Sequence, residues 1–181
     1  DDNNIQTTDF SGYNLIFIGD ERLINIKKIP KDKSIILANK YYGKKFEFID
    51  KGNIDQFASN FPLDVFSSED TQVYKVSKPA PGRINLHYYY IPIKNKKQNI
   101  ESVATTNTKY KNELGDVIAY SNEGTKKCFF GIVETKYWTA EAKDLFKDCV
   151  EFVLSGEEQP GENDTEMNET LVHNIGIDKE Y

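Results

Sequence analysis

The chain has 181 residues, enough for one ordinary domain plus tails, and with 38% hydrophobic and 13% aromatic residues it can build a core. A formal charge of −6, a pI near 5.1 and only two arginines argue against nucleic-acid binding, which depends on neutralising phosphates. No apolar run approaches the ~20 residues that span a bilayer. The opening Asp1-Asp-Asn-Asn also lacks the basic and apolar regions of a signal peptide, which fits a cytosolic protein, a mature exported one or an excised fragment.

The first half of the chain predicts two buried strands after a polar lead-in at residues 1–12. Tyr13–Ile18 and Ser34–Ala38 are nearly continuous apolar runs, as in strands that are covered on both faces. Asn53–Ser59 is predicted to form a short helix that ends near the Pro62 that follows it.

From residue 73 onward the pattern changes to aromatic and β-branched residues interrupted by prolines. Val73–Ile93 predicts irregular hairpin strands, with the three tyrosines Tyr88–Tyr90 half-buried. Ser102–Thr105 is a weaker strand candidate. Asp116–Tyr120 and Lys127–Val133 predict two further strands, joined through a hairpin turn at Asn122-Glu-Gly124.

An amphipathic helix is predicted to follow Thr139, which suits the N-cap position. Apolar residues recur at helical spacing on one stripe: Ala142, Leu145, Phe146, Cys149, Val150 and Val153. A helix that follows a buried strand and lies on its sheet is typical of α/β proteins. We therefore expect a mostly parallel sheet with an antiparallel hairpin edge, in a domain that covers residues 13–155.

The C-terminal residues differ in composition from this domain. Residues 156–170 are rich in acids and poor in apolar residues, which predicts a linker or disordered tail. Residues 171–181 resume a strand-like pattern, and a lone strand does not fold by itself. We expect this segment to dock back, to pair with another subunit or to open a further domain.

The two cysteines lie 21 residues apart and have no metal-ligand spacing, so no zinc site is expected. Cys128 and Cys149 are either buried free thiols or a disulfide worth about 3 kcal/mol, and a structural role is favoured over a reactive one. Two N-x-T sequons, at Asn163 and Asn168, are candidate glycosylation sites. Sequons and cysteines together favour an extracellular protein.

Several of these segments resemble the class I glutamine amidotransferase-like domains. They are Tyr13-Asn-Leu-Ile-Phe-Ile-Gly-Asp, Asn60-Phe-Pro-Leu63, Asp116-Val-Ile-Ala-Tyr, and the Cys-Phe-Phe-Gly-Ile and Tyr-Trp-Thr-x-Glu-Ala-Lys-Asp-Leu-Phe stretches near the helix. The chain is most similar to the non-catalytic, trehalose-utilisation-like variety found in archaeal cell-surface proteins. This resemblance spans roughly residues 10–155 and implies a flavodoxin-like three-layer sandwich.

The chain departs from that family in two ways. The family opens with a strand-helix-strand unit before the piece that matches Tyr13–Ile18, so either that unit is missing, which leaves a sheet edge open, or the chain is a fragment. Catalytic members carry a glycine-flanked Cys and a His-x-Glu, whereas the histidines here are His87 and His173 in other contexts. The resemblance therefore implies the fold without the activity, and no catalytic residue, metal or cofactor is expected.

The loops after the predicted parallel strands still deserve a test as a ligand site, because α/β sheets bind ligands outside the carboxyl ends of their strands. Five residues form this predicted rim: Asp20, Glu21, Asn39, Glu134 and Trp138. Acids beside aromatic rings could hold a sugar or a cation. The alternative is a solvated turn, an ordinary loop and an aromatic lid over the core.

We therefore expect a non-enzymatic structural or adhesive module of an extracellular cell-surface, S-layer-like or filament protein. Its partners would be other surface subunits or copies of itself, joined through a sheet edge or the terminal strand. One rival is a carbohydrate-binding protein or hydrolase that uses the rim carboxylates, which predicts that they converge with at least one shifted pKa. Another is an intracellular regulator with free thiols.

Overall fold

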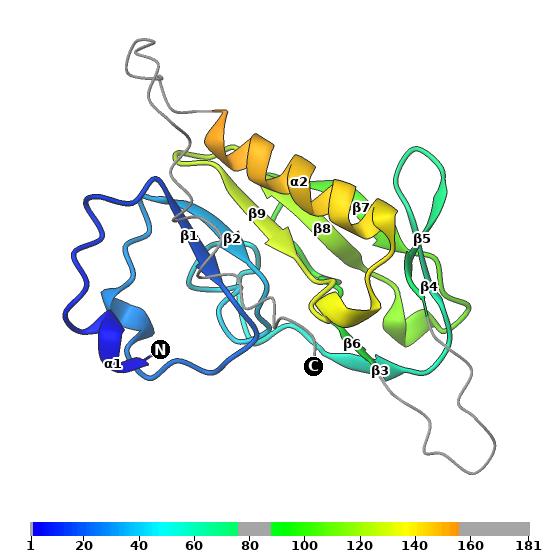
Figure 1. The fold of residues 1–181 in the computed structure, drawn as a ribbon. Helices are drawn as coiled ribbons and strands as arrows, with labels where there is room; N and C mark the ends of the chain where they lie inside the picture. The colour runs from blue at the N-terminus through cyan, green and yellow to red at the C-terminus, as the bar shows by residue number, and fades with distance from the viewer. Residues whose placement is uncertain (1, 76–87, 156–181) are drawn as a thin grey trace, which may run out of the picture.

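The computed structural model describes residues 2–75 and 88–155 (Figure 1). The helical elements are short except for the last one: α1 Asp2–Ile5, the 3₁₀ turns η1 Ile26–Lys28, η2 Lys111–Glu113 and η3 Thr135–Tyr137, and α2 Ala140–Leu154. No helix of the described residues is long and apolar enough to cross a membrane. The strands are β1 Leu15–Ile18, β2 Ser34–Leu37, β3 Phe57–Ser59, β4 Leu63–Phe66, β5 Asp70–Tyr74, β6 Tyr88–Tyr90, β7 Ile100–Thr106, β8 Asp116–Ser121 and β9 Lys127–Phe130.

Seven of these strands form one mixed sheet in the order β1-β2-β9-β8-β7-β4-β5, and β3 pairs with β6 in a small second sheet. The pairings β1–β2 and β2–β9 are parallel, and the other four are antiparallel. Five of the seven strands consequently point in one direction, and an antiparallel hairpin, β4–β5, forms one edge. The protein is an α/β protein with a mixed sheet, and the described part of the face opposite α2 is covered by loops rather than by a long helix.

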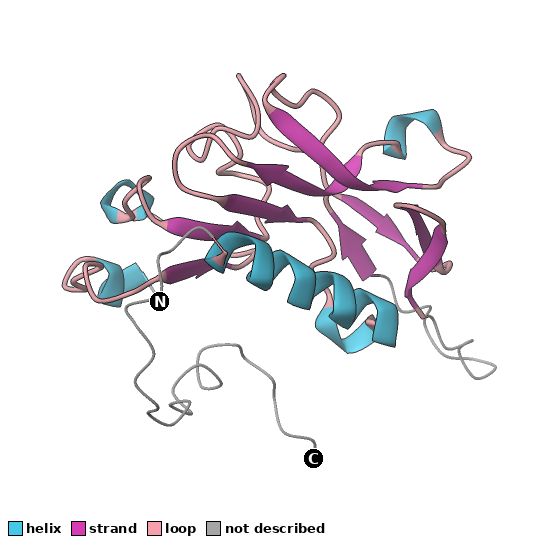
Figure 2. Cartoon of the chain, turned by 90° about the horizontal axis from the view of Figure 1, so that it is seen from above, coloured by secondary structure: helices cyan, strands magenta, loops and turns pink. Residues whose placement is uncertain are grey.

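Alternating side chains of the central strands contribute to two cores on opposite faces of the sheet. Figure 2 shows α2 on one face of the sheet and loops on the other. Ile36 of β2 and Phe130 of β9 face α2, whereas Ile35 and Phe129 pack on the loops that cover the other face. Successive strand residues point to opposite faces, so a strand that is covered on both faces must be apolar at every position. This explains why β2 and β9 are unbroken buried runs.

Helix α2 begins as the sequence predicts. The Thr139 Oγ1 atom accepts a hydrogen bond from the Ala142 N–H at 3.1 Å, which satisfies one of the unpaired donors of the first turn. The apolar stripe of α2 is buried or half-buried against the sheet, and the lysines and acids between its members are exposed. The predicted turn between β8 and β9 is also confirmed, with Gly124 at φ +70°.

In the middle of the chain, one predicted helix is wrong, one hairpin is additional, and one predicted strand is confirmed but longer than expected. Asn53–Ser59 is not a helix: residues 53–56 are irregular, and β3 pairs antiparallel with β6. The β4–β5 hairpin was not predicted. The weak strand at Ser102–Thr105 is the longest strand of the sheet, β7. Of the three tyrosines of β6, Tyr88 and Tyr90 are buried and Tyr89 is exposed, whereas residues 76–87 of the predicted hairpins lie outside the described residues.

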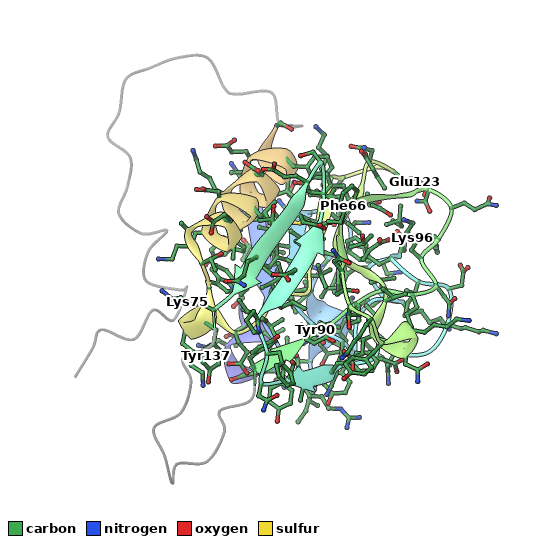
Figure 3. All side chains as sticks on the ribbon, turned by 90° about the vertical axis from the view of Figure 1, so that its right-hand side faces the viewer. Phe66, Lys75, Tyr90, Lys96, Glu123 and Tyr137 are labelled. Atoms are coloured by element: carbon green, nitrogen blue, oxygen red, sulfur yellow. A yellow bond between two sulfur atoms is a disulfide. The ribbon has the colours of Figure 1, made fainter. Side chains whose placement is uncertain are left out.

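The two edges of the large sheet differ. At the β5 edge, the segment 137–139 runs alongside: the Lys75 N–H donates to the Tyr137 carbonyl at 2.9 Å, and the Thr139 N–H donates to the Val73 carbonyl at 3.2 Å. Figure 3 shows Lys75 and Tyr137 side by side at this edge. At the opposite edge, no described strand pairs with the outer side of β1. One edge of the sheet is therefore covered, whereas the other carries no paired strand within residues 2–75 and 88–155.

Candidate functional site

The predicted rim lies where the parallel strands β1, β2 and β9 end. Asp20 and Glu21 follow β1, Asn39 follows β2, and Glu134 follows β9 at the start of η3. The parallel pairing of these strands places all three loops at the same end of the sheet.

Asp20 and Glu134 are the two predicted acids that the structure brings within electrostatic reach of each other. Partial desolvation raises the pKa of Asp20 above its usual value, and the charge of Glu134 adds to that increase. The ammonium of Lys40 acts in the opposite direction and lowers the pKa of Asp20. The rim therefore places two carboxyl groups in each other's field, with Lys40 acting on Asp20 and the Lys136 ammonium 3.9 Å from the Glu134 carboxylate.

Tyr74 supports the loop that carries Glu134. Its hydroxyl accepts a hydrogen bond from the Glu134 N–H at 2.8 Å and donates to the Tyr89 carbonyl at 2.9 Å. Burial raises the pKa of Tyr74, and the charges of Glu134 and Asp20 add to this effect. The tyrosine thus stays protonated and holds the Glu134 loop against β6.

Asn39 is not a free ligand side chain. It is fully buried, its Nδ2 donates to the carbonyls of Gly19 at 2.6 Å and Glu21 at 2.8 Å, and its Oδ1 accepts from the Tyr41 N–H at 2.8 Å. The two Nδ2 bonds join the loop after β1 to the loop after β2, and the Oδ1 bond lies within the loop after β2. Asn39 therefore fixes the position of Asp20 instead of contacting a ligand.

Trp138 also has a packing role. Its Nε1 donates to the Ile132 carbonyl at 2.9 Å, and its ring packs on Phe130 and Phe146, with centroids 5.5 and 5.4 Å away. Glu21 is exposed, and its carbonyl is held by Asn39. Of the five predicted rim residues, two lie together as carboxylates, two are part of the framework, and one faces solvent.

Sequence reasoning missed Lys40, Gln56 and Tyr74 at this rim. The Lys40 ammonium donates to Gln56 Oε1, and it also lies over the Tyr41 ring, 5.2 Å from its centroid. Lys40 directly follows Asn39, so its position was available from the sequence, but Gln56 and Tyr74 arrive from distant segments without a local signal. Two hollows on the described surface lie elsewhere, one lined in part by Ile49 and Lys94.

The remaining predicted sites are the cysteines and the sequons. Cys128 of β9 and Cys149 of α2 form a disulfide with their Cα atoms 5.9 Å apart, and both are fully buried. Asn163 and Asn168 lie outside the described residues. Within residues 2–75 and 88–155, no group of three or more His, Cys, Asp and Glu side chains is placed to hold a metal ion.

No family model, curated protein or solved structure matches this chain.

Proposed function

We propose that this chain is a non-catalytic structural or adhesive module of an extracellular cell-surface, S-layer-like or filament protein, with a flavodoxin-like three-layer core. The disulfide between Cys128 and Cys149 carries the proposal. It ties the central strand β9 to the helix that covers it, and it leaves neither cysteine as a thiolate nucleophile. Disulfides of this kind persist in oxidising compartments, which supports an exported protein.

Two further observations support the proposal. The sequons at Asn163 and Asn168 give an exported chain two acceptors for glycans in one acidic segment. No strand of the described residues pairs with the outer side of β1, where an extended segment of a neighbouring subunit would add as a further strand. The module would then act mechanically, as a rigid disulfide-pinned body that joins its neighbours by backbone hydrogen bonds.

The test is the intact mass of the protein from its native source, measured before and after reduction and after glycosidase treatment. We expect reduction to add the mass of two hydrogens and glycosidase to remove mass that peptide mapping assigns to Asn163 or Asn168. Two free thiols together with unmodified asparagines would reject the extracellular proposal and favour an intracellular regulator.

A second candidate function, saccharide or cation binding at the rim, is favoured by one specific observation. Asp20 lies in the field of Glu134 and its pKa is raised by partial desolvation, as expected where two acids serve one ligand. Carboxylate oxygens accept hydrogen bonds from sugar hydroxyl groups and are also the ligands that calcium prefers.

This second candidate is tested by following the Asp20 and Glu134 carboxyl resonances during titration with neutral oligosaccharides and, separately, with calcium chloride. Binding at the rim requires saturable shifts of these resonances. In Asp20→Asn and in Glu134→Gln, the shift of the remaining carboxyl group should disappear, whereas both shifts should persist in the matched control Glu21→Gln. Resonances that do not respond to either ligand eliminate the rim as a binding site.

A further inference from the structure

An open hollow of about 470 Å³ lies on the face of the sheet opposite α2, between η1 and the loop that follows β2. Ile26 and Tyr42 contribute apolar surface, and the other lining residues are four lysines: Lys27, Lys31, Lys44 and Lys45. We call this feature the lysine hollow. No acid lines it, and none of its four lysines takes part in an ion pair within the described residues.

The local electrostatics show that positive charge accumulates here. Burial lowers the pKa of Lys45, and the like charge of Lys31 lowers it further. The nearby carboxyl of Glu47 has its pKa lowered, chiefly by its hydrogen bond to Lys127 and also by the charge of Lys31. Residues 27–45 hold seven lysines and a single acid, Asp32. An anion in the hollow would relieve this repulsion.

The negative charge of the chain lies at its C-terminal end. Residues 156–181 contain eight of the 29 acids and one of the 23 basic residues, so their formal charge is −7, while residues 1–155 carry +1. Six of these acids fall within residues 157–169: Glu157, Glu158, Glu162, Asp164, Glu166 and Glu169. We call residues 157–169 the acidic segment. Its charge is opposite in sign to that of the hollow and is large enough to pair with all four lysines.

The end of α2, which two residues separate from the acidic segment, lies near the start of β2. Ser34 Oγ, at the start of β2, donates to the Val153 carbonyl at 3.0 Å, and Lys126 Nζ donates to Ser155 Oγ at 2.7 Å. An extended chain spans at most about 3.5 Å per residue, so Lys31 lies within about 10 Å of Ser34. By the same measure, Glu158 lies within about 10 Å of Ser155. The chain from Ser155 to Glu157 and Glu158 therefore needs to pass only the start of β2 to reach Lys31.

We propose that the acidic segment 157–169 binds the lysine hollow of its own chain, with carboxylates of the segment paired to the ammonium groups of Lys27, Lys31, Lys44 and Lys45. Each exposed pair contributes at most about 1 kcal/mol, so several pairs must act together. The short tether supplies an effective concentration in the millimolar range, which favours this contact over the same contact between separate molecules. Bound in this way, the segment that carries both sequons is held on the sheet face opposite α2.

The test is carbodiimide cross-linking of the full chain, in which a carboxylate and a contacting lysine amine are joined as an amide with loss of water. Peptide mass spectrometry of an equal mixture of ¹⁵N-labelled and unlabelled protein separates links within one chain from links between two. We expect links from Glu157, Glu158 or Glu162 to the hollow lysines, within single chains, with a yield several-fold lower in about 1 M salt than in about 0.01 M salt.

Two matched variants provide the controls. If the acidic segment is bound, we expect it to be cleaved slowly by protease in the wild type. Replacing the four hollow lysines by glutamine should abolish this protection, whereas the same replacement at four exposed lysines elsewhere should leave it unchanged: Lys51, Lys109, Lys111 and Lys143. Circular dichroism establishes that both variants fold. Links that fall mainly between labelled and unlabelled chains overturn the proposal in favour of a neighbouring copy. Links spread evenly over hollow and control lysines, or equal proteolysis in both variants, overturn it outright.

Discussion

Asn39 shows how one buried amide organises the end of the parallel strands. Its side chain bonds the loop after β1 and the loop after β2, through Gly19, Glu21 and Tyr41. The Asn39 amide itself is fully buried, and leaving a buried polar group without a partner costs about 1–3 kcal/mol. The carboxylate pair of Asp20 and Glu134 is therefore presented by a fixed framework.

Replacing Glu134 by glutamine should lower the pKa of Asp20 towards its usual value of 3.8, because the charge of Glu134 contributes to the raised pKa. A side-chain NMR titration of the wild type and the variant measures this directly. Lys40→Gln should have the opposite effect, since the Lys40 charge lowers the pKa of Asp20. An Asp20 titration curve that neither variant moves would show that the two acids do not share a site.

The same shift has a consequence for stability. A carboxyl group whose pKa is raised in the folded state stabilises the fold at low pH, and this contribution is lost as the pH rises through the folded pKa. Asp20→Asn should therefore raise the urea midpoint near neutral pH and give no gain below the usual Asp pKa. The exposed neighbour Glu21 provides the control, because Glu21→Gln should leave the midpoint unchanged at both pH values.

Gly131 sits where no side chain can be accommodated. Its carbonyl accepts from the Ile91 N–H at 2.9 Å, and a methyl group at this position would overlap the Ile91 carbonyl oxygen. Gly131→Ala should lower the free energy of unfolding by about 3 kcal/mol, because the backbone must separate or strain. Urea denaturation measures the loss. Gly12→Ala, with no atom within 4 Å of the added carbon, should change it by less than about 0.5 kcal/mol.

At the residue scale, the sequence located the acids of the rim but not their supporting contacts. Asp20 and Glu134 follow strands that are legible as apolar runs, so their placement could be predicted. Asn39 bonds the carbonyl of Gly19, and the Tyr74 hydroxyl accepts a hydrogen bond from the Glu134 N–H. Both contacts depend on how segments far apart in the chain come together. Residue type alone cannot distinguish an amide that binds a ligand from one that binds the backbone.

At the scale of the elements, the disulfide links β9 to α2, and both of these elements are predicted by the sequence. The loop that it closes has a sequence separation of 21 residues, for which the chain-entropy model gives about 3 kcal/mol. Reduction should lower the free energy of unfolding by about this amount, as measured by urea denaturation with and without dithiothreitol. The variant Cys128→Ala/Cys149→Ala should resemble the reduced protein and be insensitive to the reductant. Equal stability of the oxidised and reduced protein would contradict the structural role of the bond.

The elements that were predicted and those that were missed differ in how locally they are determined. β1, β2, β9 and α2 carry an apolar run or a helical stripe that is complete within the element. β3 was mistaken for part of a helix because its strand character depends on pairing with β6, some 30 residues further on. β4 is an exception, because Leu63 and Val65 are buried and alternate with exposed residues, a local pattern that is typical of a strand.

For the molecule as a whole, two cores on opposite faces of one sheet should make the central strands the most stable part. We expect backbone amides of β2, β8 and β9 to exchange with solvent only through global unfolding. The outward-pointing amides of β1 should exchange fast, whereas the Lys75 amide at the opposite edge should be protected by its bond to Tyr137. Hydrogen exchange followed by NMR tests this, and fast exchange at Lys75 would mean that the β5 edge is not covered.

The unequal edges of the sheet also limit how copies of the chain can assemble. Two copies that meet along the free side of β1 contribute the same strand to the contact, so a two-fold axis relates them. Such a pair is closed. The two copies form one continuous sheet whose two ends are both β5, and the backbone groups of β5 are already bonded to the segment 137–139. Unlimited growth instead requires a head-to-tail contact, such as residues 171–177 of one copy added to β1 of the next. Symmetric pairing therefore stops at a dimer, whereas a fibre requires a head-to-tail contact of this kind.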